Sequence, residues 1–215
     1  MWKEPALPAG VRARTRPGLD VGIPRAGLFL DRDGVLVEEV GYLHKVADLR
    51  LRKGAADLVR AANRAGVPVA LVSNQSGIDR GMYGWDAWEQ VEAEIDARLE
   101  RHGAWLDARV ACAFHPEHTR AWGAEHEYWR KPGPGMPLHA ARLIGADPRL
   151  SWMVGDMASD VVAAKGAGFT GAVHVLSLHG QRDEALSQLN RGFLVRPAET
   201  MAEAHQILAE HGVFG

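Results

Sequence analysis

Two aspartates separated by a single residue, Asp31 and Asp33, follow a short apolar run in the stretch LFLDRDGVLVEE. Carboxylates this close repel each other, and burial makes both charges more costly. The pair therefore indicates a cation site, a catalytic site, or both. An aspartate can attack phosphorus and form an aspartyl-phosphate. A neighbouring acid can protonate the leaving oxygen and then deprotonate the water that cleaves the intermediate. We expect Asp31 to be the nucleophile and Asp33 the proton shuttle.

Further residues with related chemistry follow other apolar runs or open a later helix: Ser73, Asn74, Lys131, Asp156 and Asp160. A site with several carboxylates suits a hard cation such as magnesium. Phosphoryl transfer also needs neutralisation of the charge on the transferring oxygens. The ammonium of Lys131 and the hydroxyl of Ser73 would supply it. Together these residue types indicate magnesium-assisted phosphoryl transfer.

The elements that must position these side chains alternate along the chain. Short apolar runs predict strands at 27–30, 67–72, 108–114, 151–156, 171–176 and 192–195. Apolar residues at spacings of three and four predict helices at 54–66, 86–102, 135–145, 158–168 and 201–212. Asp86 and Glu89 have the spacing of a capping box. This alternation predicts an α/β fold with a mainly parallel sheet covered on both faces. Ligands of such sheets bind at the carboxyl ends of the strands.

Composition bounds the classes of protein to which the chain can belong. Of its 215 residues, 47% are hydrophobic and 24% charged, and the net charge is −2. We therefore expect one globular protein without the basic excess that nucleic acids favour. No apolar stretch reaches the length of a membrane span, and Cys112 is the only cysteine. We expect a cytoplasmic protein without disulfides, acting as a monomer or weak dimer.

The first 25 residues contain several arginines and prolines and read as an extended arm, either solvated or packed on the body. Residues 26–215 are expected to form a single domain. No internal repeat interrupts that domain.

Four short motifs support a resemblance to a known family. DRDGV, SNQSG, RKP and GDMASD resemble the four motifs of the haloacid dehalogenase (HAD) superfamily, in the usual order. The resemblance covers roughly residues 26–180. It implies a Rossmann-like three-layer sandwich with a minimal cap and an aspartyl-phosphate mechanism.

Longer stretches resemble the D-glycero-D-manno-heptose 1,7-bisphosphate phosphatases within that superfamily: DRDG with EEVGYLHKVADLRL, VSNQSGIDRGMY and RKPGPGM. The resemblance implies a magnesium ion held by Asp31, the Asp33 carbonyl and Asp156, with Asp160 behind them. It implies that Ser73 and Lys131 stabilise the phosphoryl group and that Arg130 recognises substrate. It places the remaining substrate contacts at Arg32, Glu39, Val40, Gly41, Tyr42, Asn74, Gln75 and Ser76.

The chain departs from that family in the loop before RKP. The family commonly carries a zinc loop, but Phe114, Glu127 and Trp129 stand where its histidine and later cysteines are expected. Four-coordinate zinc cannot form from those positions, so we expect no zinc. Spacing alone would still permit a different set of zinc ligands: Cys112, His115, His118 and His126. The alternative is that these residues form a polar loop without metal, in which the cysteine is a small buried thiol. The family often has a lysine directly after the aspartate of the fourth motif, where this chain has Met157. This difference leaves the exact substrate open.

The sequence therefore predicts a magnesium-dependent phosphatase acting on a small phosphorylated sugar, with a heptose bisphosphate as first choice. Histidinol phosphate or another small phosphomonoester is the alternative substrate. That related family typically reads Asn-Gln-Asp-Gly where this chain has Asn74-Gln75-Ser76-Gly77. A catalytically silent binding module on the same fold is the alternative outside the enzymes. The intact pair of acids and the lysine argue against it.

Overall fold

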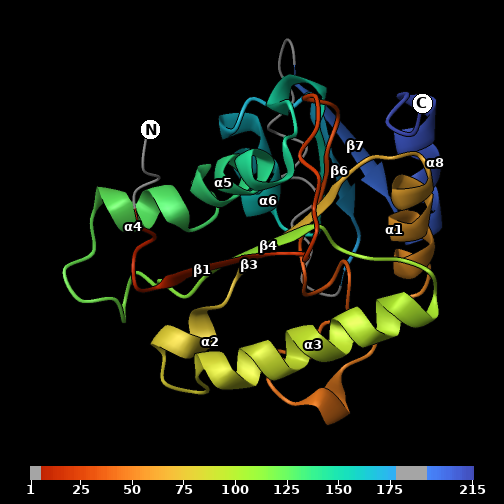
Figure 1. Cartoon of the computed structure of the whole chain (residues 1–215). Helices are drawn as coiled ribbons and strands as arrows, with labels where there is room; N and C mark the ends of the chain where they lie inside the picture. Colours follow the sequence, from red (N-terminus) through yellow and green to blue (C-terminus); the bar gives the residue numbers. More distant parts are fainter. Residues whose placement is uncertain (1–5, 178–192) are drawn as a thin grey trace.

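A computed structural model describes residues 6–177 and 193–215 (Figure 1). In these residues one sheet has seven strands in the order β1-β4-β3-β2-β5-β6-β7. Every pair of neighbours is parallel except β1 with β4. The strands are β1 (Val11–Thr15), β2 (Leu28–Leu30), β3 (Val69–Asn74), β4 (Ala108–Cys112), β5 (Trp152–Gly155), β6 (Gly171–Val175) and β7 (Leu194–Ala198). The predicted α/β fold with a mainly parallel sheet is confirmed.

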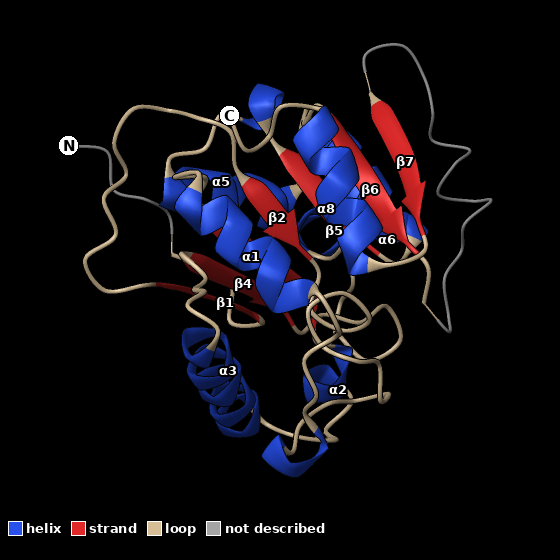
Figure 2. Cartoon of the chain, turned by 90° about the vertical axis from the view of Figure 1, so that its right-hand side faces the viewer, coloured by secondary structure: helices blue, strands red, loops and turns tan. Residues whose placement is uncertain are grey.

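Helices cover both faces of the sheet (Figure 2). They are α1 (Ala55–Arg64), α2 (Ser76–Asp79), α3 (Trp85–Arg101), α4 (Ala124–Trp129), α5 (Gly135–Ile144), α6 (Ala158–Gly166) and α8 (Met201–Glu210). Side chains of successive strand residues point to opposite faces. Leu28 and Leu30 accordingly pack in one core with residues of α1, α3 and α8. Phe29 packs in the other core with residues of α5 and α6. The result is a three-layer sandwich.

The N-terminal segment joins the sheet as its edge strand. Val11 to Thr15 pair antiparallel with Cys112 to Ala108. The arm therefore packs on the body over these residues, and the solvated alternative is wrong there. The run VRART gave little strand signal, because only Val11 is buried and the arginines reach carboxylates elsewhere in the fold. The division into an arm and a domain stays a prediction.

The start of α3 differs from the expected capping box. The helix begins at Trp85 and its N-cap is Gly84, which offers no side-chain cap. Asp86 lies in the first turn, where a negative charge is favoured by the helix dipole. Glu89 pairs with Arg12 of β1. The spacing was present, but the chain enters the helix two residues too early for Asp86 to cap it.

The sheet gathers the polar residues at one edge. β2, β3 and β5 are adjacent and parallel, so Asp31, Ser73 and Asp156 follow or end neighbouring strands on the same side. The connection from β2 to α1 contains only the short 3-10 helix η1 (Val46–Asp48). That short connection agrees with the expected minimal cap. Among the helices of the described residues, none combines the length and apolar character needed to cross a membrane.

Candidate active site

A cluster of buried acids lies at the carboxyl end of the sheet. Oxygens of Asp31, Asp156 and Asp160 all lie within 4.8 Å of one another. The ammonium of Lys131 lies 2.6 Å from Asp31 Oδ1 and 2.7 Å from Asp160 Oδ1. It also donates to the carbonyl of Val72 at 2.8 Å. The structure therefore brings together four predicted residues from three segments of the chain, three of them acids and one a base.

The imbalance shows in the protonation equilibria. Burial raises the pKa of Asp31 well above its usual range, although Lys131 opposes the shift, and the neighbouring acids add to it. Burial and Asp160 raise the pKa of Asp156 to about 6. Burial would lower the pKa of Lys131, yet Asp160 and Asp31 raise it above its ordinary value, so the lysine stays charged. A cation held by the carboxylates would relieve the repulsion among them.

The donor set fits a hard divalent cation. All candidate ligands are carboxylate oxygens, which suit magnesium or calcium better than zinc. Oδ1 of Asp156 is buried and has no hydrogen-bond partner in the part of the chain that the structure describes. A buried polar atom is rarely left unsatisfied. Its position beside Asp31 and Asp160 marks it as an oxygen suited to bind an ion.

Gly34 allows the two sides of this cluster to approach each other. Its φ is +79°, in the left-handed region that glycine tolerates best. A Cβ at this position would collide with the carboxylate of Asp156. The glycine after the acid pair in DRDG is therefore required both by the turn and by the closeness of Asp156.

Lys131 is held in place through its backbone. Its N–H donates to Asn74 Oδ1 at 3.1 Å, and its carbonyl accepts from Asn74 Nδ2 at 3.0 Å. This reciprocal pair links the end of β3 to the loop before α5. Ser73, on the same strand, is buried and accepts a hydrogen bond from Gln75 Nε2 at 2.6 Å. Asn74 thus positions the lysine, while Ser73 lines the same pocket as Asp31 and Lys131.

Asp33 is held by a different set of partners. The guanidinium of Arg32 donates from Nε to one carboxylate oxygen at 3.0 Å and from Nη2 to the other at 3.1 Å. Gln75 Nε2 donates to Asp33 at 3.2 Å, and Gln75 in turn accepts from the Tyr83 hydroxyl at 2.9 Å. Asp33 is therefore oriented on two sides. The Arg32 side chain, predicted to contact substrate, is 1% exposed and directs its donors into the protein.

A second cavity of about 210 Å³ adjoins the cluster. It shares Asp33, Glu39 and Asn74 with the pocket that contains Asp31. Most of the residues predicted to contact substrate line it: Arg32, Glu39, Gly41, Tyr42, Asn74, Gln75, Ser76 and Arg130. Val40 does not line this cavity and is 48% exposed. The cavity offers room for the part of a substrate that extends away from the reacting group.

Hydrogen bonds and aromatic rings hold the loop between β4 and α5. Arg130 Nη1 donates to the carbonyl of Phe114 at 2.8 Å. The Phe114 ring meets the edge of His126 with centroids 4.5 Å apart, and His126 stacks on Trp122 at 5.6 Å. These contacts join the two ends of the loop, which is the task that a structural metal would otherwise perform.

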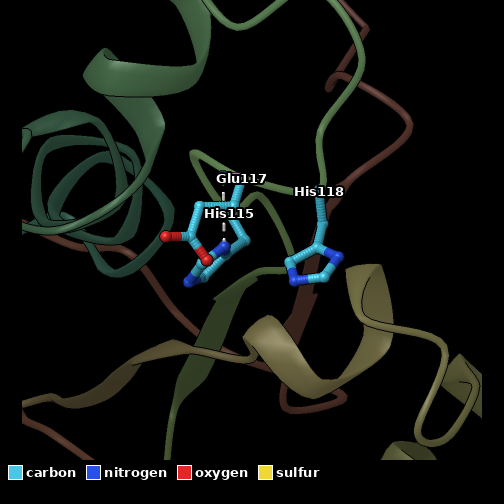
Figure 3. Close-up of side chains that lie close together, drawn as sticks. All are labelled: His115, Glu117 and His118. Carbon is cyan, nitrogen blue, oxygen red and sulfur yellow. Dashed lines mark hydrogen bonds between the residues drawn. The ribbon is translucent and has the colours of Figure 1, made fainter.

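The alternative zinc set is not assembled as its spacing suggested. His115 and His118 do lie together, with Glu117 as their third neighbour (Figure 3). Cys112, however, is fully buried in β4, and burial raises the pKa of its thiol to about 12. His126 is engaged with the two rings described above. Nε2 of His115 lies 2.8 Å from the guanidinium of Arg80, a cation that disfavours a second cation there.

Three residues near the site escaped the sequence analysis: Arg80, Tyr83 and Glu92. Tyr83 orients Gln75, and the Arg80 guanidinium lies 6.0 Å from the centre of the Tyr42 ring. Glu92 is completely buried and pairs with Arg32. A signal for Glu92 existed, because it occupies the apolar face of α3 together with Trp88, Val91 and Ile95. A charged residue on a buried face indicates a buried partner.

Known proteins are similar in sequence to most of this chain. A family profile described as HAD-hydrolase-like matches residues 128–204. A D-glycero-beta-D-manno-heptose-1,7-bisphosphate 7-phosphatase from Mesorhizobium japonicum is 34% identical over 182 residues, covering 85% of this chain and 80% of the relative. The chain belongs to this family of HAD-like phosphatases. Another member, from Thermosynechococcus vestitus, is 42% identical over 156 residues, covering 69% of this phosphatase and 78% of the relative.

Solved structures agree with the fold of this phosphatase. A HAD-like phosphatase from Mesorhizobium loti superposes with a TM-score of 0.83 at 31% identity, covering 99% of this chain and 98% of the other. The D,D-heptose 1,7-bisphosphate phosphatase from B. bronchiseptica, complexed with magnesium and phosphate, superposes with a TM-score of 0.71 at 25% identity. It covers 86% of this chain and 98% of its own. The predicted superfamily, fold and enzyme class are confirmed.

Proposed function

We propose that this phosphatase removes the 7-phosphate of D-glycero-D-manno-heptose 1,7-bisphosphate and leaves the 1-phosphate. The observation that carries the proposal is the Asp31 carboxylate, held by Lys131 in a buried pocket that opens beside a cavity for the sugar. The two relatives described above carry the name of this activity.

The residues divide the reaction between them. An oxygen of Asp31 attacks phosphorus, so that a P–O bond to the aspartate forms while the P–O bond to the sugar breaks. Asp33 gives a proton to the departing sugar oxygen and then takes one from the water that hydrolyses the aspartyl-phosphate. Lys131 and Ser73 stabilise the charge on the transferring oxygens. Asp160 keeps the Lys131 ammonium in place.

We propose magnesium as the cofactor, held by Asp31, Asp156 and the carbonyl of Asp33. When bound, the ion neutralises charge on the phosphoryl oxygens and on the acids around it. The unpartnered Oδ1 of Asp156 and the all-oxygen donor set support this choice. The loop that lacks the family's zinc ligands is already joined by Arg130, Phe114, His126 and Trp122, which supports a protein without zinc.

The adjoining cavity supports a substrate with a second anionic group. Arg130 lines it, and Arg80 lies close by, over the ring of Tyr42. Within the described residues neither guanidinium forms an ion pair with a carboxylate, so both charges are available to a ligand. Arginine suits a fixed, two-point contact with phosphate. We propose that these two arginines bind the phosphate or the sugar hydroxyls remote from the reacting phosphorus.

A substrate panel tests the function. The purified protein with magnesium should hydrolyse the heptose 1,7-bisphosphate with a kcat/KM at least about tenfold above that for histidinol phosphate, sugar monophosphates and an aryl phosphate, because one contact to a charged group is worth about 1.5–3 kcal/mol. Higher efficiency on histidinol phosphate would move the assignment to that alternative. No hydrolysis of any ester would support the silent binding module. A monomer or weak dimer in the cytoplasm stays a prediction.

A further inference from the structure

Behind Asp33 lies a line of charges that the reaction chemistry does not use. Arg32 binds Asp33 with two hydrogen bonds and reaches away from it with Nη1, which lies 3.3 Å from Glu92 Oε1. The other oxygen of Glu92 accepts from Arg109 Nε at 3.0 Å. Arg109 also pairs with Asp96, which Arg14 of the edge strand reaches at 3.0 Å. Acids and arginines alternate from the catalytic pocket to the first strand.

The inner part of this line is removed from water. The side chains of Arg32, Glu92 and Arg109 are 1%, 0% and 3% exposed. Burying ions is costly, and an apolar trio of similar volume is often at least as stable. Burial also lowers the pKa of Arg109, which Glu92 counteracts. Stabilisation of the fold therefore does not explain these buried charges well. A role in orienting the Arg32 guanidinium explains them better.

Arg32 has little freedom because all of its partners are fixed. Besides Asp33 and Glu92, its Nη2 donates to the carbonyl of Leu43 at 3.2 Å. Glu92 is itself anchored on α3 and held by Arg109 from β4. The carboxylate of Asp33 thus faces a guanidinium whose plane is set by a helix and a strand away from the reacting atoms.

We propose that Glu92 is a positioning residue for catalysis, which acts through Arg32 to aim the carboxyl group of Asp33 at the leaving oxygen. This inference rests on the proposed function, in which Asp33 transfers the proton. Glu92 touches neither the substrate nor the reacting atoms. Its loss allows the guanidinium to turn, so the acid is displaced while the nucleophile, Lys131 and the metal ligands keep their places.

The leaving group separates this role from a merely structural one. Proton donation matters for a sugar alkoxide, which is a poor leaving group, and hardly for a nitrophenolate, which leaves without help. A misplaced catalytic group costs up to about 10²-fold. Glu92→Gln should therefore lower kcat/KM for a sugar phosphate about 10- to 100-fold and change kcat/KM for p-nitrophenyl phosphate less than about threefold. This quantity reports the first step and not the later hydrolysis of the aspartyl-phosphate, which both substrates share.

Two control variants and one rescue accompany this measurement. Glu94→Gln removes a carboxylate on the same helix that pairs with Arg98 at 2.8 Å. Asp107→Asn removes a buried carboxylate that accepts from the Val69 N–H at 2.9 Å. Both should leave the ratio of the two kcat/KM values unchanged. Glu92→Asp keeps the charge and should restore part of the ratio. If Glu92→Gln does not fold, the ratio for Glu92→Asp, compared with wild type, decides in the same way.

A double-mutant cycle tests whether the effect passes through Arg32. Arg32→Lys keeps the charge but loses the two-pronged contact with Asp33. If Glu92 acts through Arg32, Glu92→Gln adds less than about twofold to the change in the ratio of kcat/KM values in that background. Full additivity, or an equal loss on both substrates, overturns the inference. The proposed function fails separately, if the wild-type protein hydrolyses no phosphate ester or acts more efficiently on histidinol phosphate than on the heptose bisphosphate.

Discussion

Two charged clusters meet at Asp31 and Asp33, and they differ in their balance. At Asp31, three carboxylates share one ammonium, and an oxygen of Asp156 is left without a partner. Along the line that begins with Asp33, three acids alternate with three arginines, and each charge faces an opposite one. The first cluster has unpaired negative charge, which suits the proposed binding of a cation and attack on phosphorus. In the second every charge is paired, so its members beyond Asp33 are suited to orienting that acid and not to reacting.

This difference explains why neighbouring aspartates can have different tasks. Burial and the neighbouring acids raise the pKa of Asp31, because they destabilise its negative charge. A bound cation, or a bond to the electrophilic phosphorus, would relieve that destabilisation. Asp33 is bound on two sides by Arg32 and Gln75. When two carboxyl groups in one site have different surroundings, that difference indicates which one acts as nucleophile and which as acid–base group.

Removing the single cation of the first cluster should have the largest effect. Lys131→Ala takes away the charge that faces Asp31 and the transferring oxygens. We expect kcat to fall about 10³-fold on every phosphate ester, whatever the leaving group, as for the loss of a transition-state donor. Steady-state kinetics on a sugar phosphate and an aryl phosphate measure it. A loss confined to the sugar phosphate would contradict the assignment.

Changing Asp33 should have an effect that depends on the leaving group of the ester, unlike the change at Lys131. Asp33→Asn keeps the shape of the side chain but cannot transfer the proton. Because general acid–base catalysis is worth about 10²–10⁴-fold, kcat/KM for the sugar phosphate, which reports the first step, should fall at least about 10²-fold. The loss of kcat/KM for an aryl phosphate should be much smaller. Equal losses of kcat/KM on both esters would place Asp33 with the first cluster.

Arg130 offers a milder test because it lies at the substrate cavity, away from the cluster around Asp31. Arg130→Ala should raise KM for the bisphosphate about 10- to 100-fold, as expected for the loss of a charged hydrogen bond. Its kcat on an aryl phosphate should remain nearly unchanged. If kcat fell on both substrates as severely as in Lys131→Ala, the division between a reacting and a recognising base would be wrong.

The metal site predicts a smaller, pH-dependent effect on stability. The pKa of Asp156 in the folded protein is about 6, above the value of about 3.9 of an unperturbed aspartate. In the metal-free protein this group therefore lowers the free energy of unfolding as the pH rises from about 4 to about 6. Magnesium relieves that repulsion. Excess magnesium should raise Tm by about 5–10 °C at pH 8.

At pH 5 protons compete for the same carboxylate, so the shift should be clearly smaller. Differential scanning calorimetry with and without magnesium at both pH values measures it. A shift of equal size at pH 5 and pH 8 would show that Asp156 does not hold the ion. Elemental analysis of the same preparation should find little zinc.

The residues proposed to be catalytic were predictable because they follow apolar runs in the sequence. Asp31, Ser73 and Asp156 follow or end strands that the sequence marks clearly, and parallel strands bring their carboxyl ends together. The orienting residues were less visible. Glu92 lies within a helix and Arg109 within an apolar strand, and their pairing joins segments whose register no local pattern sets. The edge strand escaped for a similar reason, because its arginines are paired only in the folded chain.

The central claim is that Asp31 is the nucleophile of a heptose bisphosphate phosphatase. Asp31→Asn tests it most directly, because an amide cannot form the acyl-phosphate at a useful rate. Phosphate release from D-glycero-D-manno-heptose 1,7-bisphosphate with magnesium would be compared among wild type, this variant and Asp48→Asn, which alters an exposed carboxylate in η1. We expect wild type and Asp48→Asn to release one equivalent and leave the 1-phosphate, and Asp31→Asn to release none while folding normally by circular dichroism. A variant that kept a tenth of wild-type turnover would contradict the covalent mechanism through Asp31.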